Sequence, residues 1–231
     1  MCEDCGCGDA GKVVMVDKPV AEANDRIAHD NQHKLEHHGI FCINIMGSPG
    51  SGKTTVIEGL CRYLNPDDLA VIQGDLESDV DKKRLDAQGI NAFQINTHSG
   101  CHLNAKMVSD ALKEMSLMGK KYLIIENVGN LVCPAGVRLG QHLNLVVSST
   151  TEGSDKPKKY PLIFMDAGCI VISKSDLMSA AGFAKDDYVA GLKRINRKAR
   201  IIETSIHNPD SFKGVADFIM HAKGLRSGHA H

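Results

Sequence analysis

The sequence predicts an α/β domain with a mostly parallel β-sheet flanked by helices, and three observations support this prediction. Short apolar segments alternate with helical stretches from residue 40 onward, as in parallel sheets that are covered on both faces. A glycine-rich phosphate-binding motif joins the first of these segments to a helix. The composition, with 42% hydrophobic residues in a chain of 231, supports one buried core and a small appendage rather than two full domains.

Charge and hydropathy exclude two classes of partner. The 27 Lys and Arg residues nearly balance the 28 Asp and Glu residues, so the net charge of −1 gives no general attraction to nucleic acid or to an anionic membrane. No apolar run approaches the roughly 18 residues of a membrane span, and the amino terminus lacks a secretory signal pattern. We therefore expect a cytoplasmic protein, whose eight cysteines are metal ligands, nucleophiles or core residues rather than disulfides.

Residues 1–16 predict a cysteine-rich metal-binding tail. Cys2, Cys5 and Cys7 form a C-x-x-C-x-C pattern broken by glycines. Three thiolates on such a segment can converge on one ion, and removal of Met1 would free the amine of Cys2 as a nitrogen donor. This donor set suits nickel in planar geometry or zinc in tetrahedral geometry. The alternative is a disordered tail whose thiols bind no metal.

Residues 17–39 predict a polar connecting helix, because their few apolar residues recur at near-helical spacing. His29, His33 and His37 follow one another at four-residue intervals and share one face of that helix. The spacing is compatible with weak metal binding and with a solvated polar face. The sequence favours the solvated face, because no carboxylate or cysteine is fixed beside the histidines.

Residues 40–231 predict a single domain in which strands and helices alternate. The strand candidates are residues 41–46, 69–73, 92–95, 121–126, 143–149, 169–173 and 200–204. Helical segments are expected to begin near Lys53, Ser78, Leu103, Ala184 and Ser211. The polar stretch 150–161 predicts a long surface loop without secondary structure, near the functional edge of the sheet.

The phosphate-binding motif follows the first strand candidate directly. Its residues, which match G-x-x-x-x-G-K-[ST] and continue into Thr55, are Gly47, Ser48, Pro49, Gly50, Ser51, Gly52, Lys53 and Thr54. Glycines allow the backbone N–H groups to point inward, and the positive end of the following helix attracts anions. Lys53 would then reach the outer phosphates, and Thr54 would place its hydroxyl on Mg²⁺.

Two acidic residues follow other strand candidates, where a parallel sheet holds its ligands. Asp75 comes after the second strand and Glu126 ends the fourth. A carboxylate at either position could hold Mg²⁺ or its water ligands near the phosphates. For Asp75, the alternative is a cap on the helix expected near Ser78.

A base-recognition element follows the sixth strand candidate. The sequence SKSD, residues 173–176, resembles the N-K-x-D element with which GTPases read guanine. The Asp176 carboxylate can accept two hydrogen bonds from the guanine edge, whereas adenine would leave it unpaired. Lys174 would lie along the nucleotide. Ser173 stands where Asn is usual, so hydrogen bonds that tie the loops together are shortened or lost.

A second group of metal-ligand types occurs within the domain. Cys101 and His102 are adjacent in THSGCHLN, and Cys133 follows Glu126 by seven residues. Because their loops should share one edge of the sheet, these three residues predict a metal site, with His98 as an extra candidate ligand. Scattered packing cysteines are the alternative. Three further cysteines lie within apolar patterns and are assigned to the core: Cys42, Cys61 and Cys169.

Six stretches, in this order, resemble the HypB family of hydrogenase maturation GTPases: CEDCGCG, GSPGSGKT, GDLESDVD, THSGCHL, ENVGNLVCP and SKSD. The similarity covers nearly the whole chain. It implies a P-loop GTPase of the SIMIBI type that binds GTP or GDP with Mg²⁺, forms a homodimer that depends on nucleotide or metal, and delivers nickel to a [NiFe] hydrogenase precursor with a maturation partner. A role shared with urease is compatible with it. The resemblance also implies a tight nickel site in the tail, and a nickel or zinc site near the dimer interface formed by Cys101, His102 and Cys133.

Two other classes of function use parts of the same pattern. A small-molecule kinase would share the phosphate loop but would bind ATP, and it has no use for SKSD or the cysteines. A metal buffer with a vestigial nucleotide site would not need Lys53 and Thr54 intact. Competition between nucleotides distinguishes the first alternative, and a turnover assay the second.

Overall fold

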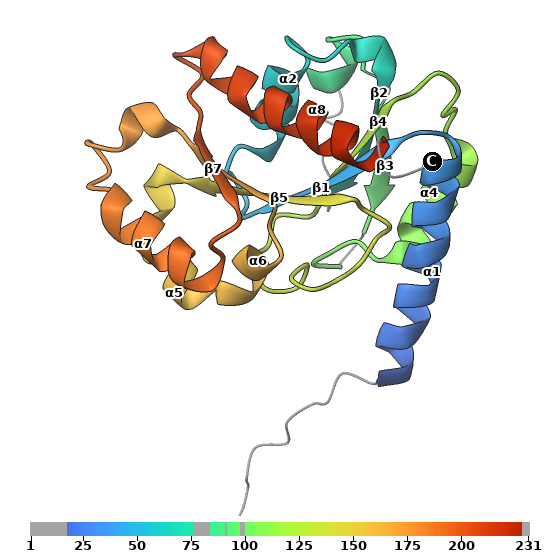
Figure 1. The fold of residues 1–231 in the computed structure, drawn as a ribbon, viewed down its shortest axis with the longest axis horizontal. Coiled ribbons are helices and arrows are strands. Elements are labelled where there is room, and N and C mark those ends of the chain that lie inside the picture. Colours follow the sequence, from blue (N-terminus) through green and yellow to red (C-terminus); the bar gives the residue numbers. More distant parts are fainter. Residues whose placement is uncertain (1–17, 76–83, 91, 98–99, 228–231) are drawn as a thin grey trace, which may run out of the picture.

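A seven-stranded sheet lies at the centre of the protein (Figure 1). The computed structural model describes residues 18–75, 84–90, 92–97 and 100–227. The strands follow the order β3-β2-β4-β1-β5-β6-β7, and each neighbouring pair is parallel. Their bounds are β1 Phe41–Gly47, β2 Leu69–Asp75, β3 Ala92–Asn96, β4 Tyr122–Glu126, β5 Leu143–Ser149, β6 Cys169–Ser173 and β7 Arg200–Glu203. The predicted fold class and all seven strands are confirmed.

Helices cover both faces of the sheet (Figure 1). Their bounds are α1 Lys18–His37, α2 Lys53–Leu60, α4 Ala105–Glu114, α5 Lys156–Lys159, α6 Pro161–Met165, α7 Lys185–Ile195 and α8 Lys213–Ser227. On one face, α2 and α8 pack onto the sheet through apolar side chains such as Ile57 and Ile219. On the other face, α1 and α4 form one apolar cluster with the sheet, while α6 and α7 form another.

Three helix starts differ from the sequence prediction or lie outside the described residues. Helix α4 begins at Ala105 rather than Leu103, because Asn104 caps it: the Asn104 Oδ1 accepts the Met107 N–H at 2.9 Å. The last helix begins at Lys213, after a 3₁₀ turn over Pro209–Phe212. The start expected near Ser78 lies outside the described residues.

The central strands are largely apolar in sequence and buried, as in sheets covered on both faces, whereas the edge strands β3 and β7 are partly exposed. Every residue of β1, β4 and β6 is buried. Cys42 and Cys169 lie fully inside these strands, and Cys61 is half-buried beside them. Burial raises the pKa of Cys61 to about 11 and that of Cys169 to about 12, so both thiols stay protonated. The assignment of these three cysteines to the core is confirmed.

The segment 150–161 is not the structureless loop that the sequence predicts. It contains a 3₁₀ turn over Thr150–Glu152 and the helix α5, and α6 begins at its end. Pro157 favours a first helical turn because its fixed φ suits that position, and its ring is buried against Gly191 of α7. The polar side chains hide this structure from a pattern search, since the stretch has no apolar periodicity.

Helix α1 is docked on the domain through a buried amide. The Asn31 Nδ2 donates to the backbone carbonyls of Ala105 at 2.9 Å and of Leu139 at 3.1 Å. Gly140, at φ +105°, permits this close approach, because a Cβ there would lie 2.7 Å from the Asn31 Cβ. The connecting helix predicted over 17–39 is therefore present as a packed element, while its role as a boundary between domains stays a prediction.

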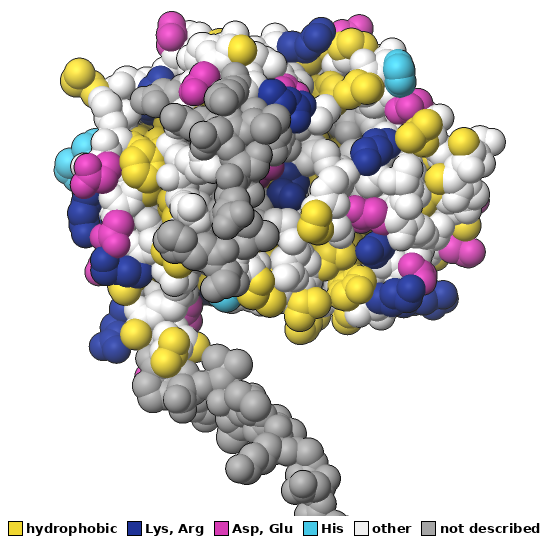
Figure 2. All heavy atoms as spheres, turned by 180° about the vertical axis from the view of Figure 1, so that it is seen from behind, with side chains coloured by type: hydrophobic (Ala, Val, Ile, Leu, Met, Phe, Trp, Pro, Cys, Tyr) yellow, Lys and Arg dark blue, Asp and Glu magenta, His cyan; other side chains and the backbone are white. Residues whose placement is uncertain are grey.

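The surface carries charges of both signs side by side. On the face shown in Figure 2, Lys and Arg side chains alternate with Asp and Glu side chains rather than forming one basic field. This distribution agrees with the balanced net charge. Among the helices described, none combines the length and the apolar character that crossing a bilayer demands.

Candidate functional site

The phosphate loop lies at the carboxyl end of β1, where strands of a parallel sheet present their ligand-binding edge. Residues 47–52 connect the buried β1 to α2. Gly52 takes the left-handed conformation at φ +96° and directly precedes the first turn of α2. The loop therefore leads directly into the amino-terminal turn of α2, whose N–H groups point toward the loop, and such a helix start is a common anion site.

Lys53 and Thr54 begin α2 and are both buried. The Lys53 Nζ donates to the Ser48 carbonyl at 3.3 Å, so the ammonium lies across the phosphate loop. The Thr54 Oγ1 donates to the Glu126 Oε1 at 2.7 Å. The structure thus brings together the hydroxyl and one of the carboxylates predicted for magnesium, and this oxygen donor set fits a hard cation.

Glu126 is positioned by a residue that sequence reasoning missed. The Gln73 Nε2 donates to the Glu126 Oε2 at 3.0 Å, and both side chains are buried. Gln73 lies opposite Glu126 in the register between β2 and β4. The sequence offered one signal for Gln73, namely a polar residue at the end of the apolar run LAVIQ. The other predicted carboxylate, Asp75, ends β2 two residues later, and its side chain lies outside the described part.

A cavity of about 240 Å³ beside the phosphate loop contains the predicted base-recognition residues. Thr55 lines it from α2, and Lys174 and Asp176 line it from the turn after β6. The Ser205 Oγ donates to the Asp176 Oδ1. This hydrogen bond lowers the pKa of the Asp176 carboxyl, which therefore remains an ionised acceptor facing the cavity. Sequence reasoning missed Ser205, which follows β7 and carries no motif of its own.

The base-recognition turn is tied to the phosphate loop despite the serine at position 173. The Ser173 Oγ donates to the Ser51 carbonyl at 2.5 Å, and the Lys174 Nζ donates to the Gly50 carbonyl at 2.8 Å. Lys174 has φ of 55°, the only positive value at a non-glycine residue in the described ranges. A serine at position 173 was expected to shorten or remove the hydrogen bonds between the two loops. In the structure, the Ser173 side chain makes one direct, short hydrogen bond to the phosphate loop.

The loop that follows β5 also reaches the phosphate loop. The Ser48 Oγ donates to the Glu152 Oε2 at 3.3 Å. Burial raises the pKa of the Glu152 carboxyl, with the nearby Lys156 acting in the opposite direction. The expectation that residues 150–161 lie near the functional edge is met, although their secondary structure was not predicted.

The three predicted ligands in the domain lie together. The ligand atoms of Cys101, His102 and Cys133 are all within 4.8 Å of one another, and the Cys101 Sγ is 3.5 Å from the His102 Nδ1. Burial lowers the pKa of His102, which keeps its imidazole neutral and able to ligate. A hydrogen bond with Cys101, together with some burial, raises the pKa of the Cys133 thiol. His98 lies outside the described residues.

Two asparagines that the sequence reasoning missed link this cluster to the nucleotide residues. The Asn127 Oδ1 accepts the Leu103 N–H at 3.1 Å, which ties the end of β4 to the residue after His102. The Asn130 N–H donates to the Gly47 carbonyl at 3.0 Å, and its Oδ1 accepts the Cys133 N–H at 3.2 Å. The segment that carries Cys133 is thus hydrogen-bonded to the first glycine of the phosphate loop.

The tail ligands Cys2, Cys5 and Cys7 lie outside the described residues, so the tail site stays a prediction.

Comparison with known proteins agrees with this geometry. Residues 41–203 match the nucleotide-binding domain of the CobW/HypB/UreG family. The hydrogenase/urease maturation factor HypB of Helicobacter hepaticus is 38% identical over 224 residues, which cover 94% of this chain and 92% of that protein. The crystal structure of HypB from Helicobacter pylori in complex with nickel has a TM-score of 0.84 and 36% identity, covering 90% of this chain and 99% of that one. HypB from Archaeoglobus fulgidus gives a TM-score of 0.81 and 37% identity, with 87% and 99% covered. The phosphate loop, the base turn and the cysteine–histidine cluster therefore lie in a chain that belongs to the HypB family.

Proposed function

We propose that this chain is a GTP-hydrolysing nickel metallochaperone that delivers nickel during the maturation of [NiFe] hydrogenase. The proposal extends to nickel delivery for urease. One observation carries the proposal: the loop of Cys133 is hydrogen-bonded to the phosphate loop through Asn130. A metal-ligand cluster and a nucleotide site built on one connected segment are what a nucleotide-controlled metal carrier requires. The names of the relatives, which are maturation factors, and the nickel in the Helicobacter pylori structure support the same role.

The nucleotide half of the proposal assigns a role to each polar residue at the sheet edge. Lys53 would contact the outer phosphates of GTP, and the backbone of residues 47–52 would donate to them. Thr54, Glu126 and Asp75 would hold Mg²⁺ directly or through water. When bound, Mg²⁺ would offset the charge of the phosphate oxygens. Asp176 would accept the two guanine donors.

The metal half uses two sites with different donor sets. Cys2, Cys5 and Cys7 would form the tight nickel site, with Zn²⁺ as a competing ion. Cys101, His102 and Cys133 would form a second site for nickel or zinc, which a second copy of the chain would complete across a two-fold axis. We accordingly propose a cytoplasmic homodimer whose assembly depends on nucleotide or metal. Its partners would be a hydrogenase maturation protein and the hydrogenase precursor.

The test of the nucleotide half is hydrolysis by the purified chain. Lys53→Ala should abolish GTP turnover, because the charge that develops on the phosphates then lacks its cation, an effect of several kcal/mol. Lys158→Ala is the matched control, since Lys158 is an exposed lysine of α5, and it should keep full turnover. Equal turnover in the two variants would exclude the phosphate loop as the site of hydrolysis.

The choice of base is tested by competition. ATP should fail to displace labelled GTP from the unmodified chain. Asp176→Asn should weaken GTP and favour a xanthine nucleotide, because the amide donates where the carboxylate only accepts. If ATP displaced GTP equally well, the protein would be assigned to the kinases instead.

The tight nickel site is tested by replacing Cys2, Cys5 and Cys7 with Ala. The variant should lose one tightly bound nickel equivalent and its thiolate-to-metal absorption, while GTP hydrolysis stays nearly unchanged. Retention of tight nickel binding would remove the tail from the proposal.

A further inference from the structure

Two exposed histidines on α1 lie within hydrogen-bonding distance of each other. His29 and His33 occupy successive turns of the helix, and their Nε2 atoms are 3.2 Å apart. The two rings meet edge to face, with centroids 4.4 Å apart at 76°. Both side chains are exposed to solvent.

The distance between the two Nε2 atoms matches that between two imidazole nitrogens bound to one metal ion. Imidazole nitrogens bind a divalent ion at about 2.0–2.1 Å, so two of them at 90–109° around one ion lie roughly 2.9–3.4 Å apart. The observed Nε2–Nε2 distance of 3.2 Å falls within that interval. The distance between the two nitrogens is therefore compatible with one ion held by both rings after a small adjustment of the rings.

A carboxylate supports the orientation of His33. The Glu36 Oε2 lies 3.8 Å from the His33 Nδ1, on the side of the ring opposite the Nε2 atom. The other oxygen of Glu36 accepts the Gln32 Nε2 at 3.0 Å and lies 3.4 Å from the His142 Nε2, so the carboxylate is held in place. A carboxylate near the Nδ1 side of a histidine is a common neighbour of metal-bound imidazoles.

The helix backbone between the two histidines is fixed. Asn31, two residues from each, is buried on the other side of α1 and donates to Ala105 and Leu139. The turn that carries His29 and His33 is therefore held against the domain, and little conformational entropy is lost when both rings bind one ion.

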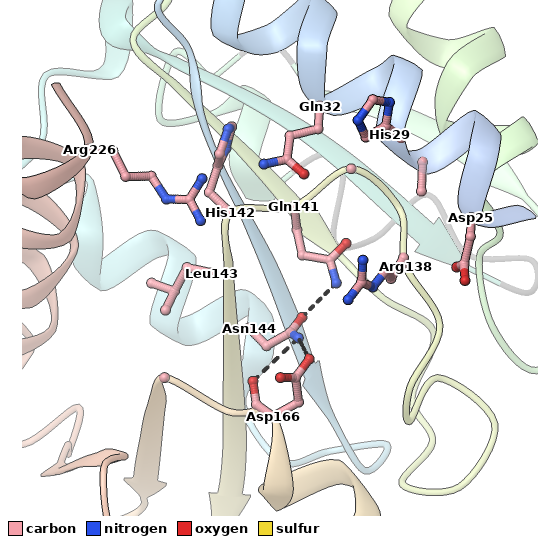
Figure 3. A pocket seen from close by; sticks show the side chains of 13 residues that line it. Asp25, His29, Gln32, Arg138, Gln141, His142, Leu143, Asn144, Asp166 and Arg226 are labelled. Carbon is pink, nitrogen blue, oxygen red and sulfur yellow. Dashed lines mark hydrogen bonds between the residues drawn. The ribbon is translucent and has the colours of Figure 1, made fainter. Parts of the chain in front are cut away.

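One of the two histidines, His29, borders a polar pocket. Figure 3 shows His29 and Gln32 on α1 lining a cavity of about 380 Å³, with Arg138 and His142 on its other walls. The cavity lies at the amino end of β5, where Leu143 also lines it. This is the edge of the sheet opposite the phosphate loop, so an ion bound here would be separate from the nucleotide site.

We propose that His29 and His33 form a two-histidine site for a borderline divalent cation of the nickel or zinc type, with water in its remaining positions. Within the described ranges, the one group of three ligand residues whose atoms lie within 4.8 Å of one another is Cys101, His102 and Cys133. The site on α1 thus has two protein ligands, which makes it weaker than a thiolate site and quickly exchanging. It is independent of nucleotide binding.

The experiment is a titration with Ni²⁺, and separately with Zn²⁺, of the full chain in which the cysteines of the two other sites are Ser. His29→Ala and His33→Ala should each weaken one binding equivalent by at least about tenfold, because each removes half of a chelate. The double variant should lose little more than either single variant, because one imidazole alone binds the ion only weakly. Since Ala favours helix more than His does, α1 keeps its structure, which circular dichroism checks.

The matched control is the double variant His37→Ala/His38→Ala. These residues are also exposed, but they are adjacent in the chain and their ring centroids are 5.5 Å apart. The control should bind as the parent does. An equal loss in the control, or single variants within twofold of the parent, would overturn the proposal.

A second measurement uses the chain with all its cysteines, in case their replacement impairs folding. The imidazole NMR signals of His29 and His33 should shift together as Zn²⁺ is added beyond the equivalents taken up by cysteine. Independent shifts of the two signals would also overturn the proposal. GTP binding serves as a separate readout, which should be equal in the parent and in every histidine variant, so a failure here is distinguishable from a failure of the proposed function.

Discussion

Glu126 is the residue on which the proposed magnesium site depends most directly. It accepts hydrogen bonds from both Thr54 and Gln73. Glu126→Gln would place an amide N–H against one of these donors and remove the negative charge, so we expect GTP hydrolysis to fall at least about a hundredfold. The fall should be accompanied by a higher Mg²⁺ requirement, measured as the Mg²⁺ concentration at half-maximal rate.

Gln73→Ala is the companion variant, because it keeps the carboxylate and removes only a residue that positions it. Its hydrolysis rate should lie between those of the parent and Glu126→Gln. A Glu126→Gln variant with the parent's Mg²⁺ requirement would show that Asp75 or water holds the ion without Glu126.

Residues with a local signature could be predicted, and residues that act through tertiary contacts could not. Lys53, Thr54 and Asp176 lie in motifs whose spacing reports their chemistry. Gln73 and Asn130 act only because β2 lies beside β4 and because one loop folds back onto Gly47. Sequence alone contains no local pattern for such pairs, apart from the oddity of a polar residue in an apolar run.

The thiols of the domain cluster predict a pH dependence of metal binding. The pKa of Cys133 is raised by its hydrogen bond with Cys101, so the thiol keeps its proton through the neutral range. The pKa of His102 is lowered by burial, so its imidazole is already neutral there. Metal binding at Cys133 must therefore displace its thiol proton, whereas His102 has no imidazolium proton to displace, and affinity should rise between pH 6 and pH 8 by about tenfold per pH unit for each proton displaced.

This dependence is measured by metal titration of a variant that lacks the tail cysteines. Cys133→Ser should flatten the slope by about one proton, since the hydroxyl does not ionise in this range. A slope that is unchanged in Cys133→Ser would place the metal elsewhere.

Among the secondary-structure elements, α1 depends on the close approach of Gly140. A Cβ at Gly140 would meet the Asn31 Cβ at 2.7 Å and the Ala28 carbonyl oxygen at 3.0 Å. Gly140→Ala should therefore lower the free energy of unfolding by about 1–2 kcal/mol for the positive φ and by roughly 1–3 kcal/mol more for overpacking. Chemical denaturation measures the total.

Gly136→Ala separates the two contributions. Gly136 also has a positive φ, of 80°, but a Cβ there would meet nothing within 4 Å. This variant should show the conformational cost alone. Equal destabilisation by the two variants would mean that α1 shifts to accommodate the new methyl group at no cost in unfolding free energy.

Elements with apolar periodicity were predictable, and those stabilised by single contacts were not. The seven strands are visible as short runs of mostly apolar residues, because both faces of the sheet are covered. Helix α5 spans only Lys156–Lys159, and the buried Pro157 is its main anchor. So short an element has no periodicity to detect, and the stretch 150–161 therefore resembled a loop.

At the scale of the whole molecule, the structure predicts reciprocal coupling between nucleotide and metal. The Cys133 segment is bonded to Gly47 through Asn130, so a nucleotide that moves the phosphate loop should also move Cys133. We expect metal affinity at the domain cluster to differ between GDP and a non-hydrolysable GTP analogue by roughly 5-fold to 150-fold, with nucleotide affinity changed by the same factor. Light scattering of the same samples should show a larger mass in the tighter-binding state.

Asn130→Ala should reduce this ratio toward one, because the Asn130 Oδ1 no longer accepts the Cys133 N–H. Asn130→Asp keeps an acceptor oxygen and should retain most of the coupling. If the parent itself showed equal metal affinities within twofold in both nucleotide states, the coupling would be excluded.

The anchored helix α1 also limits how far the proposed tail site can deliver its metal. Asn31 and Asn24 fix the helix to the domain, so the tail is tethered within two helical turns of an anchored residue. From Cys7 to Lys18 the chain advances by 11 residues, which span at most about 40 Å even when fully extended. A receiving protein must therefore bring its own thiolates or imidazoles inside that radius around Lys18. Insertions before α1 would lengthen the reach of the tail. Deletions there would shorten it and exclude acceptor proteins whose metal ligands lie farther from Lys18.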